Sequence, residues 1–380
     1  MLPQLITKAR EQLGVTERIV ILTATSGDTG KAALEGFHDV PGTAIAVFYP
    51  DGGVSAVQRA QMVTQCGGNV HVTGVRGNFD DCQRGVKEAF RDVDAAEYGM
   101  RLSSANSINI GRLAPQVIYY FSAYAQLAAD GGIAVGDAVD FIVPTGNFGD
   151  ILAGLYAKLL GLPVGRLVCA SNVNNVLFDF IRTGRYDARR DFVRTSSPSM
   201  DILVSSNLER LLFIAADGDT EAVRGWMNAL STDGVYSVDA SAHKRIRGWF
   251  SAGYADESAT RRTIARVWAE NAYLCDPHTA VAMSVLDDYR RSADYTGAPC
   301  VVLSTASPFK FPAVVLDSIS GSASGDEFDQ MEELSDLSGL PIPKNLASLR
   351  SLPELHRAVV DRCRITSAVR DILSEEAHRA

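Results

Sequence analysis

The chain has 380 residues, a formal net charge of −9, 46% apolar residues and 21% charged residues. This composition excludes intrinsic disorder, because core-forming residues are many and charges are few. The acidic balance argues against nucleic acid as a partner, since phosphates would be repelled. No apolar run reaches the ~18 residues that a membrane helix needs, so we expect no membrane partner. At about 150 residues per domain, the length predicts two or three lobes.

The beginning of the chain lacks the basic and apolar regions of a signal peptide. The cysteines are widely scattered, and none forms a C-x-x-C pair. This pattern gives no support to a zinc site or a thioredoxin-like site. We therefore expect reduced thiols and a cytoplasmic location.

A helix is predicted at the start of the chain, because apolar residues recur there at helical spacing: Leu2, Leu5, Ile6, Ala9 and Leu13. Gly14 follows them and is expected to end the helix. The pattern includes Met1 and has no polar cap before it. We expect a shortened chain or a late start, and we expect Leu2, Leu5 and Ile6 to pack against structure that precedes Met1.

The rest of the chain alternates predicted strands and helices. The strands are residues 18–23, 44–49, 69–73, 139–143, 166–170 and 300–303, and helices over 31–37, 57–65, 79–90, the segment after Asn109, and up to Leu160 lie between them. This alternation predicts an α/β fold of parallel-rich sheets with helices on both faces. We expect a smaller lobe over residues 1–128 and a larger lobe over 129–380, with a mostly helical segment over 178–285.

Small and polar residues follow three predicted strands, where ligands bind in open α/β sheets. Two of these turns, Thr25–Gly30 and Gly146–Asp150, contain glycine and open a helix, so their N–H groups favour an anion. The third is Ser304 with Thr305, whose hydroxyls suit a heteroaromatic nitrogen. Each also has a simpler interpretation: turns capped by Asp28 and Asp150 without any ligand, and an ordinary strand end.

Two nucleotide-binding motifs are excluded. A P-loop fails because Thr25 replaces its first glycine and Ala32 replaces the hydroxyl residue after Lys31. The G-x-G-x-x-G motif is absent after the predicted strands. A fourth polar cluster, Ser104–Arg112, predicts either a second phosphate site with Arg112 as a bidentate donor or helix capping by Ser107 or Asn109.

Together these segments resemble threonine synthase, a family of pyridoxal phosphate enzymes with the tryptophan-synthase-β-like fold, fold type II. The matching strings occur in family order: LTATSGDTGK (22–31), SSANSINIGR (103–112), VPTGNFGD (143–150), ASNVN (170–174), DPHTAV (276–281) and STASPFKF (304–311). Sulfhydrylases and dehydratases of this fold share the first loop type but lack S-A-N-S-I-N and G-N-F-G-D. The resemblance implies conversion of O-phospho-L-homoserine and water to L-threonine and phosphate, by a monomer or homodimer.

The resemblance also implies residue roles. Asp28, Gly146, Asn147, Phe148, Gly149, Asp150 and Thr305 are expected to contact pyridoxal 5′-phosphate, with Gly146–Asp150 around its phosphate and Thr305 facing the ring nitrogen. Thr25, Ser26, Gly27, Thr29, Ser107, Asn109 and Arg112 are expected to bind the substrate, and Lys310 adds positive charge. We expect the turns at Gly27 and Gly146 to lie side by side around the pyridoxal ring.

One family feature is missing from the sequence. The family binds its cofactor as a Schiff base to a lysine in a Phe-Lys-Asp segment, and no such segment occurs here. We expect this lysine just upstream of Met1, and therefore expect this chain alone to be inactive. Two alternatives stay open: a non-catalytic paralogue that binds a ligand, and another lyase of fold type II, such as a dehydratase or a sulfhydrylase.

Overall fold

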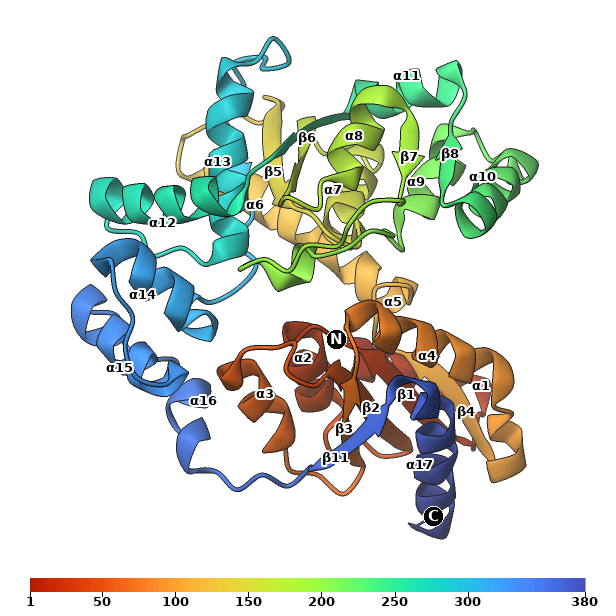
Figure 1. The fold of residues 1–380 in the computed structure, drawn as a ribbon. Helices are drawn as coiled ribbons and strands as arrows, with labels where there is room; N and C mark the ends of the chain where they lie inside the picture. The colour runs from red at the N-terminus through yellow and green to blue at the C-terminus, as the bar shows by residue number, and fades with distance from the viewer. Residues whose placement is uncertain (380) are drawn as a thin grey trace. The chain divides into compact units, whose positions relative to one another are not determined.

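The computed structural model describes residues 1–379, which divide into two compact units: residues 1–112 with 324–379, and residues 113–323. Both units are α/β, as expected (Figure 1). The division differs from the expected one in two ways. The boundary lies after Arg112 and not after residue 128, and the C-terminal segment belongs to the first unit, to which it adds a strand and a helix. The structure thus assigns the two ends of the chain to one unit.

Unit 1 contains a five-stranded sheet in the order β11-β3-β2-β1-β4, in which all neighbouring pairs are parallel. Its strands are β1 (Arg18–Ala24), β2 (Thr43–Pro50), β3 (Val70–Arg76), β4 (Met100–Ser104) and β11 (Ala358–Asp361). Its helices are α1 (Leu2–Leu13), α2 (Asp28–Phe37), α3 (Ala56–Val63), α4 (Phe79–Asp92), α15 (Glu327–Ser338), α16 (Lys344–Ala347) and α17 (Ile365–Arg379). Helix α5 (Ile110–Leu113) lies at the boundary with unit 2.

Unit 2 contains a four-stranded parallel sheet in the order β10-β5-β6-β9 and an antiparallel pair, β7-β8. Its strands are β5 (Val139–Pro144), β6 (Val164–Ser171), β7 (Arg185–Asp187), β8 (Val235–Ser237), β9 (Phe250–Tyr254) and β10 (Cys300–Val302). Its helices are α6 (Val117–Ala129), α7 (Gly149–Leu159), α8 (Val176–Thr183), α9 (Leu208–Ala215), α10 (Thr220–Asp233), α11 (Ala240–Trp249), α12 (Glu257–Asn271), α13 (Pro277–Arg291) and α14 (Pro312–Ser320).

Short 3-10 helices complete the chain: η1 (Ala95–Tyr98), η2 (Ala114–Gln116), η3 (Pro198–Met200), η4 (Pro308–Lys310), η5 (Leu349–Ser351) and η6 (Arg362–Arg364). The segment expected to be mostly helical, 178–285, contains four complete helices, α9–α12, and most of α13, but it also supplies β7, β8 and β9. Of these, β9 belongs to the main sheet of unit 2.

Helix α1 forms where the apolar spacing predicts it, and Gly14 ends it with a left-handed φ of 62°. Leu2 and Ile6 pack against the core of unit 1, whereas Leu5 is 48% exposed. Leu2 and Ile6 thus contact residues of unit 1 while staying only partly buried, and the expectation that all three side chains pack against structure preceding Met1 stays a prediction.

The C-terminal helix α17 is fixed to unit 1 by apolar and ionic contacts. An added Cβ on Gly85 of α4 would lie 2.4 Å from Ile365 Cδ1, so the two helices need a glycine to approach this closely. The fully buried Glu376 lies 2.5 Å from Arg18 Nη1 and 2.9 Å from His71 Nε2. Burial opposes ionisation of Glu376, but the hydrogen bond from His71 and the charge of Arg18 outweigh it and lower its pKa.

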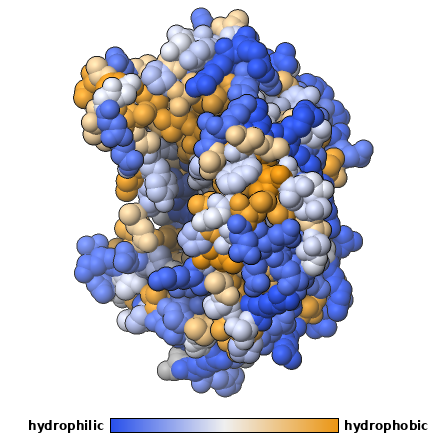
Figure 2. Space-filling view, turned by 90° about the vertical axis from the view of Figure 1, so that its left-hand side faces the viewer, coloured by the Kyte–Doolittle hydropathy of each residue, from blue (hydrophilic) through white to orange (hydrophobic). Residues whose placement is uncertain are grey.

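The surface in Figure 2 is largely hydrophilic, with hydrophobic residues scattered over it in small groups. Among residues 1–379, no helix combines the length and the apolar character needed to cross a membrane. All six cysteines are free thiols in the structure, three of them buried: Cys82, Cys169 and Cys275.

Candidate active site

The turn between β1 and α2 is braced by its own threonine. The Thr25 hydroxyl oxygen is buried and accepts hydrogen bonds from the N–H groups of Gly27 (2.9 Å) and Gly30 (2.8 Å). Gly27 has a φ of 136°, and an added Cβ there would lie 2.5 Å from the Gln58 side chain. A side chain at residue 27 would therefore be both strained and crowded.

The expected cap of α2 is wrong, because Gly27 and not Asp28 occupies the N-cap position. Asp28 is the first residue of the helix, and its Oδ1 accepts a hydrogen bond from Gln58 Nε2 at 3.1 Å. A carboxylate in the first turn still interacts favourably with the helix dipole. Ser26 and Thr29 are half-buried in the same turn.

The Ser104–Arg112 cluster lies directly against this turn within unit 1. Asn106 pairs with the backbone of Ala24, accepting from its N–H at 3.0 Å and donating to its carbonyl at 2.6 Å. Arg112 donates to Ala105 O at 2.8 Å and to Thr29 Oγ1 at 3.3 Å. The structure thus brings the predicted substrate residues Thr29 and Arg112 into contact.

Asn109 is used locally, as the capping interpretation expected. Its Oδ1 accepts from Gly111 N at 2.9 Å, and its Nδ2 donates to Ser104 O at 2.8 Å. Ser107 is half-buried in the same loop. The amide of Asn109 therefore fixes the loop that presents Ser107 and Arg112.

In unit 2, the predicted Gly146–Asp150 turn joins β5 to α7. Phe148 is the N-cap of α7 with a left-handed φ of 61°, so the expected cap at Asp150 is wrong. The side chain of Phe148 is buried, and the centroid of its ring lies 5.5 Å from that of the Phe250 ring. The structure stores backbone strain at this residue and compensates it by core packing.

A neighbouring segment supports the turn from outside. Ser205 donates to Gly146 O at 2.9 Å, and Asn207 donates to Asn147 O at 2.9 Å. Ser206 Oγ lies 3.2 Å from Asn147 Oδ1. These serine and asparagine residues were not predicted, because the sequence has no signal that pairs residues 205–207 with the turn.

Asp150 lies in the first turn of α7, where its carboxyl accepts a hydrogen bond from Tyr120 at 3.0 Å. Burial raises the pKa of Asp150 to about 6, against the hydrogen bond from Tyr120, which lowers it. The expected residue Thr305 is exposed just beyond the end of β10, which pairs with β5. The two predicted cofactor segments of unit 2 therefore follow neighbouring parallel strands.

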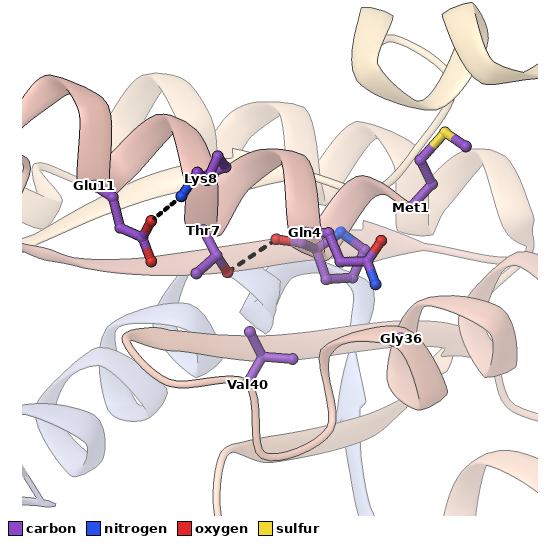
Figure 3. Close-up of a pocket in the computed structure, with 8 residues that line it drawn as sticks. Met1, Gln4, Thr7, Lys8, Glu11, Gly36 and Val40 are labelled. Atoms are coloured by element: carbon purple, nitrogen blue, oxygen red, sulfur yellow. Dashed lines mark hydrogen bonds and ion pairs between the residues drawn. The ribbon is translucent and has the colours of Figure 1, made fainter.

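The Gly27 and Gly146 turns belong to different units. Their expected side-by-side arrangement stays a prediction. A separate hollow lies along α1, lined by Met1, Pro3, Gln4, Thr7, Lys8, Glu11, Gly36 and Val40 (Figure 3). None of these is a predicted site residue, and the ion pair between Lys8 and Glu11 (2.8 Å) at its border is exposed.

Comparison with known proteins identifies relatives over most of the chain. Residues 279–360 match the family model described as threonine synthase, C-terminal. The chain is 40% identical over 354 residues to human threonine synthase-like 1, covering 90% of this chain and 46% of that protein. It is 41% identical over 347 residues to the threonine synthase of Pseudomonas aeruginosa, covering 90% of this chain and 71% of that one.

A solved structure resembles the fold as well. The pyridoxal-phosphate-bound threonine synthase from Brucella melitensis is 39% identical, with a TM-score of 0.81 over 97% of this chain and 74% of that chain. The predicted fold type II is therefore confirmed. The chain spans less than half the length of the human relative that it matches.

Proposed function

Because this chain belongs to the threonine synthase family, we propose that its protein converts O-phospho-L-homoserine and water to L-threonine and phosphate with pyridoxal 5′-phosphate. This reaction makes it a carbon–oxygen lyase acting on phosphates, in the last step of threonine biosynthesis. The observation that carries the proposal is the Gly146–Asp150 turn at the start of α7, held rigid by remote side chains.

The residues of unit 2 fit the proposed cofactor. The first N–H groups of α7 have no acceptor within the helix, and the helix dipole adds positive potential, so this end suits a phosphate. Gly146 lets the turn lie directly against the backbone of Ser199 and Met200, where a side chain would not fit. Thr305 offers a neutral hydroxyl beyond a neighbouring strand, which suits an unprotonated ring nitrogen.

The residues of unit 1 fit a small dianionic substrate. Arg112 brings a permanent positive charge to the Thr25–Gly30 turn, and the N–H groups of that turn open α2. We assign the substrate phosphate to Ser107, Asn109 and Arg112, and the substrate carboxylate to the turn at Ser26, Gly27 and Thr29. Thr25 acts by holding the turn in shape, since its hydroxyl is engaged by two backbone N–H groups.

When bound, the cofactor supplies the electron sink that lets a substrate lose a proton beside its amino group. The chain's own residues have simpler tasks: binding two phosphates at separate anion sites and keeping the substrate in a reactive orientation. The free thiols are compatible with a reducing, cytoplasmic environment, which we also propose.

Phosphate release from O-phosphohomoserine by the protein tests this proposal. We expect release that depends on added pyridoxal phosphate and falls when Arg112 is changed to Leu. O-acetylserine serves as a control substrate without a phosphate and should not be turned over. Cofactor binding without any phosphate release would instead favour a non-catalytic paralogue.

A further inference from the structure

The DPHTAV motif at the start of α13 places a buried carboxylate at the centre of a hydrogen-bond network in unit 2. Asp276 is fully buried and caps α13. Its Oδ1 accepts from the His278 backbone N–H (2.9 Å) and ring Nδ1 (2.8 Å), and its Oδ2 accepts from the Thr279 hydroxyl. Burial opposes ionisation, yet the hydrogen bonds from His278 and Thr279 keep the pKa of Asp276 below its usual value.

One arm of the network leads to the Gly146 turn. His278 Nε2 accepts a hydrogen bond from Ser199 N at 3.3 Å, so the ring connects Asp276 to Ser199. The Ser199 carbonyl oxygen borders Gly146 so closely that an added Cβ would lie 2.4 Å from it. The position of Ser199 therefore determines the space behind the turn.

The ASNVN motif fixes the other side of the same segment. Asn172 Nδ2 donates to Asp201 Oδ1 at 2.8 Å, and Asn174 Nδ2 donates to the same oxygen at 3.0 Å. All three side chains are buried. Two motifs that have no assigned role in binding thus converge on Ser199–Asp201, the segment that borders Gly146.

The second arm leads to the end of β10. The hydroxyl oxygens of Thr279 and Ser304 lie 3.3 Å apart, and Tyr273 donates to Ser304 Oγ at 3.2 Å. Each hydroxyl has a single proton, so a consistent chain runs from Tyr273 to Ser304, to Thr279 and to Asp276. Ser304 directly precedes Thr305, so this arm orients the segment that carries Thr305.

We propose that Asp276 is a positioning residue that holds the backbone bordering Gly146 and the strand end carrying Thr305 at a fixed separation. The proposal rests on the proposed function, in which these two segments bind the phosphate and the ring nitrogen of one cofactor. A rigid ligand is bound tightly only when both contacts are in register, so one shared buried anchor pre-organises the site.

Hydrogen exchange of the cofactor-free protein tests the network without relying on activity. In Asp276→Asn, we expect amide exchange in both 199–201 and 304–306 to accelerate about tenfold, because an amide nitrogen faces the donors that the carboxylate accepted. In Thr279→Val, only 304–306 should change. Unchanged exchange in both segments of Asp276→Asn would overturn the proposal.

Matched variants separate positioning from packing. Thr260 is a buried helical threonine like Thr279, but its hydroxyl donates to its own helix at Asp256 O (2.9 Å). Thr260→Val should leave both segments unchanged. Thr279→Ser should restore exchange close to wild type, because it keeps the hydroxyl. If Thr279→Ser accelerates exchange as much as Thr279→Val does, the change in exchange comes from lost packing and not from the lost hydroxyl, and the inference fails. This comparison decides the inference even if Asp276→Asn does not fold.

Pyridoxal phosphate titration of the protein provides the link to function. We expect Asp276→Asn to weaken binding about tenfold and Thr279→Val to shift the absorption maximum of the bound cofactor. Failure of the wild-type protein to bind pyridoxal phosphate would refute the proposed function, while the exchange experiment still decides the network. Tight wild-type binding that neither variant alters would refute the positioning role alone.

Discussion

Replacing Gly146 by alanine tests whether the turn before α7 is as tightly enclosed as the structure indicates. The new Cβ would lie 2.4 Å from Ser199 O and 3.2 Å from Met200 Cα, whereas real Cβ contacts essentially never fall below 3.0 Å. The two backbone segments must therefore separate by about 0.6 Å. Ser199 is tied to His278, and Gly146 O is tied to Ser205, so neither side moves without disturbing a hydrogen bond.

Overpacking of this kind costs about 1–3 kcal/mol in well-packed sites. We expect Gly146→Ala to lower the free energy of unfolding by about 2 kcal/mol, measured by urea denaturation. Gly225→Ala is the matched control, because Gly225 lies exposed within α10 with no atom near an added Cβ. That change should stabilise the protein by up to about 1 kcal/mol.

Cofactor binding gives a second measurement on the same variant. A shift of the Gly146 backbone moves the N–H groups of α7 away from a phosphate, so we expect at least about tenfold weaker binding of pyridoxal phosphate. The reasoning is refuted if Gly146→Ala is as stable as wild type and binds the cofactor equally well. Loss of stability without loss of binding would show that the turn does not contact the phosphate.

Three further changes probe other contacts. Glu376→Gln should destabilise the fold at pH 7. Because folding lowers the pKa of Glu376, the stability difference between wild type and variant is present above about pH 4.5 and is lost as the pH falls through the lowered pKa. Thermal unfolding at several pH values measures this difference. Tyr120→Phe removes the donor to Asp150 and should raise its pKa above about 6, measured by carboxyl NMR titration. Thr25→Val should lower the free energy of unfolding by about 2 kcal/mol, because two buried N–H groups lose their acceptor.

Each of these changes has an informative contrary result. A Glu376→Gln difference that stays constant between pH 7 and pH 3 would show that the carboxylate charge contributes nothing to α17. Tyr124→Phe on the same helix serves as the control for Tyr120, since Tyr124 donates to Asp137 O instead. An unchanged Asp150 titration in Tyr120→Phe, or a fully stable Thr25→Val, would contradict the corresponding contact.

The core strands were predictable because their apolar runs are uninterrupted. Strands β1, β2 and β5 are buried along most of their length, and each was predicted within one or two residues of its ends. Strands β4, β7, β8, β9 and β11 were missed. Strand β11 has four residues, and its partner β3 lies far away in the sequence, so only the folded chain reveals the pairing.

The helix caps show a different limit of sequence reasoning. Asp28 and Asp150 have the residue type that favours N-caps, but α2 begins one residue earlier, and α7 two residues earlier, than such caps require. Gly27 and Phe148 take the cap positions with positive φ, and each is held there by contacts with residues remote in sequence. Local preference identified both turns, whereas their geometry depends on tertiary packing.

Both candidate turns are bordered by residues that do not belong to them. Gln58 borders Gly27 in unit 1, and Ser199 borders Gly146 in unit 2. A turn supported in this way cannot relax when a ligand arrives, so the cost of ordering it is met during folding and not during binding. Substitutions in the supporting segments should therefore weaken ligand binding without removing any ligand contact. This consequence distinguishes a pre-organised site from a pair of ordinary strand-to-helix turns.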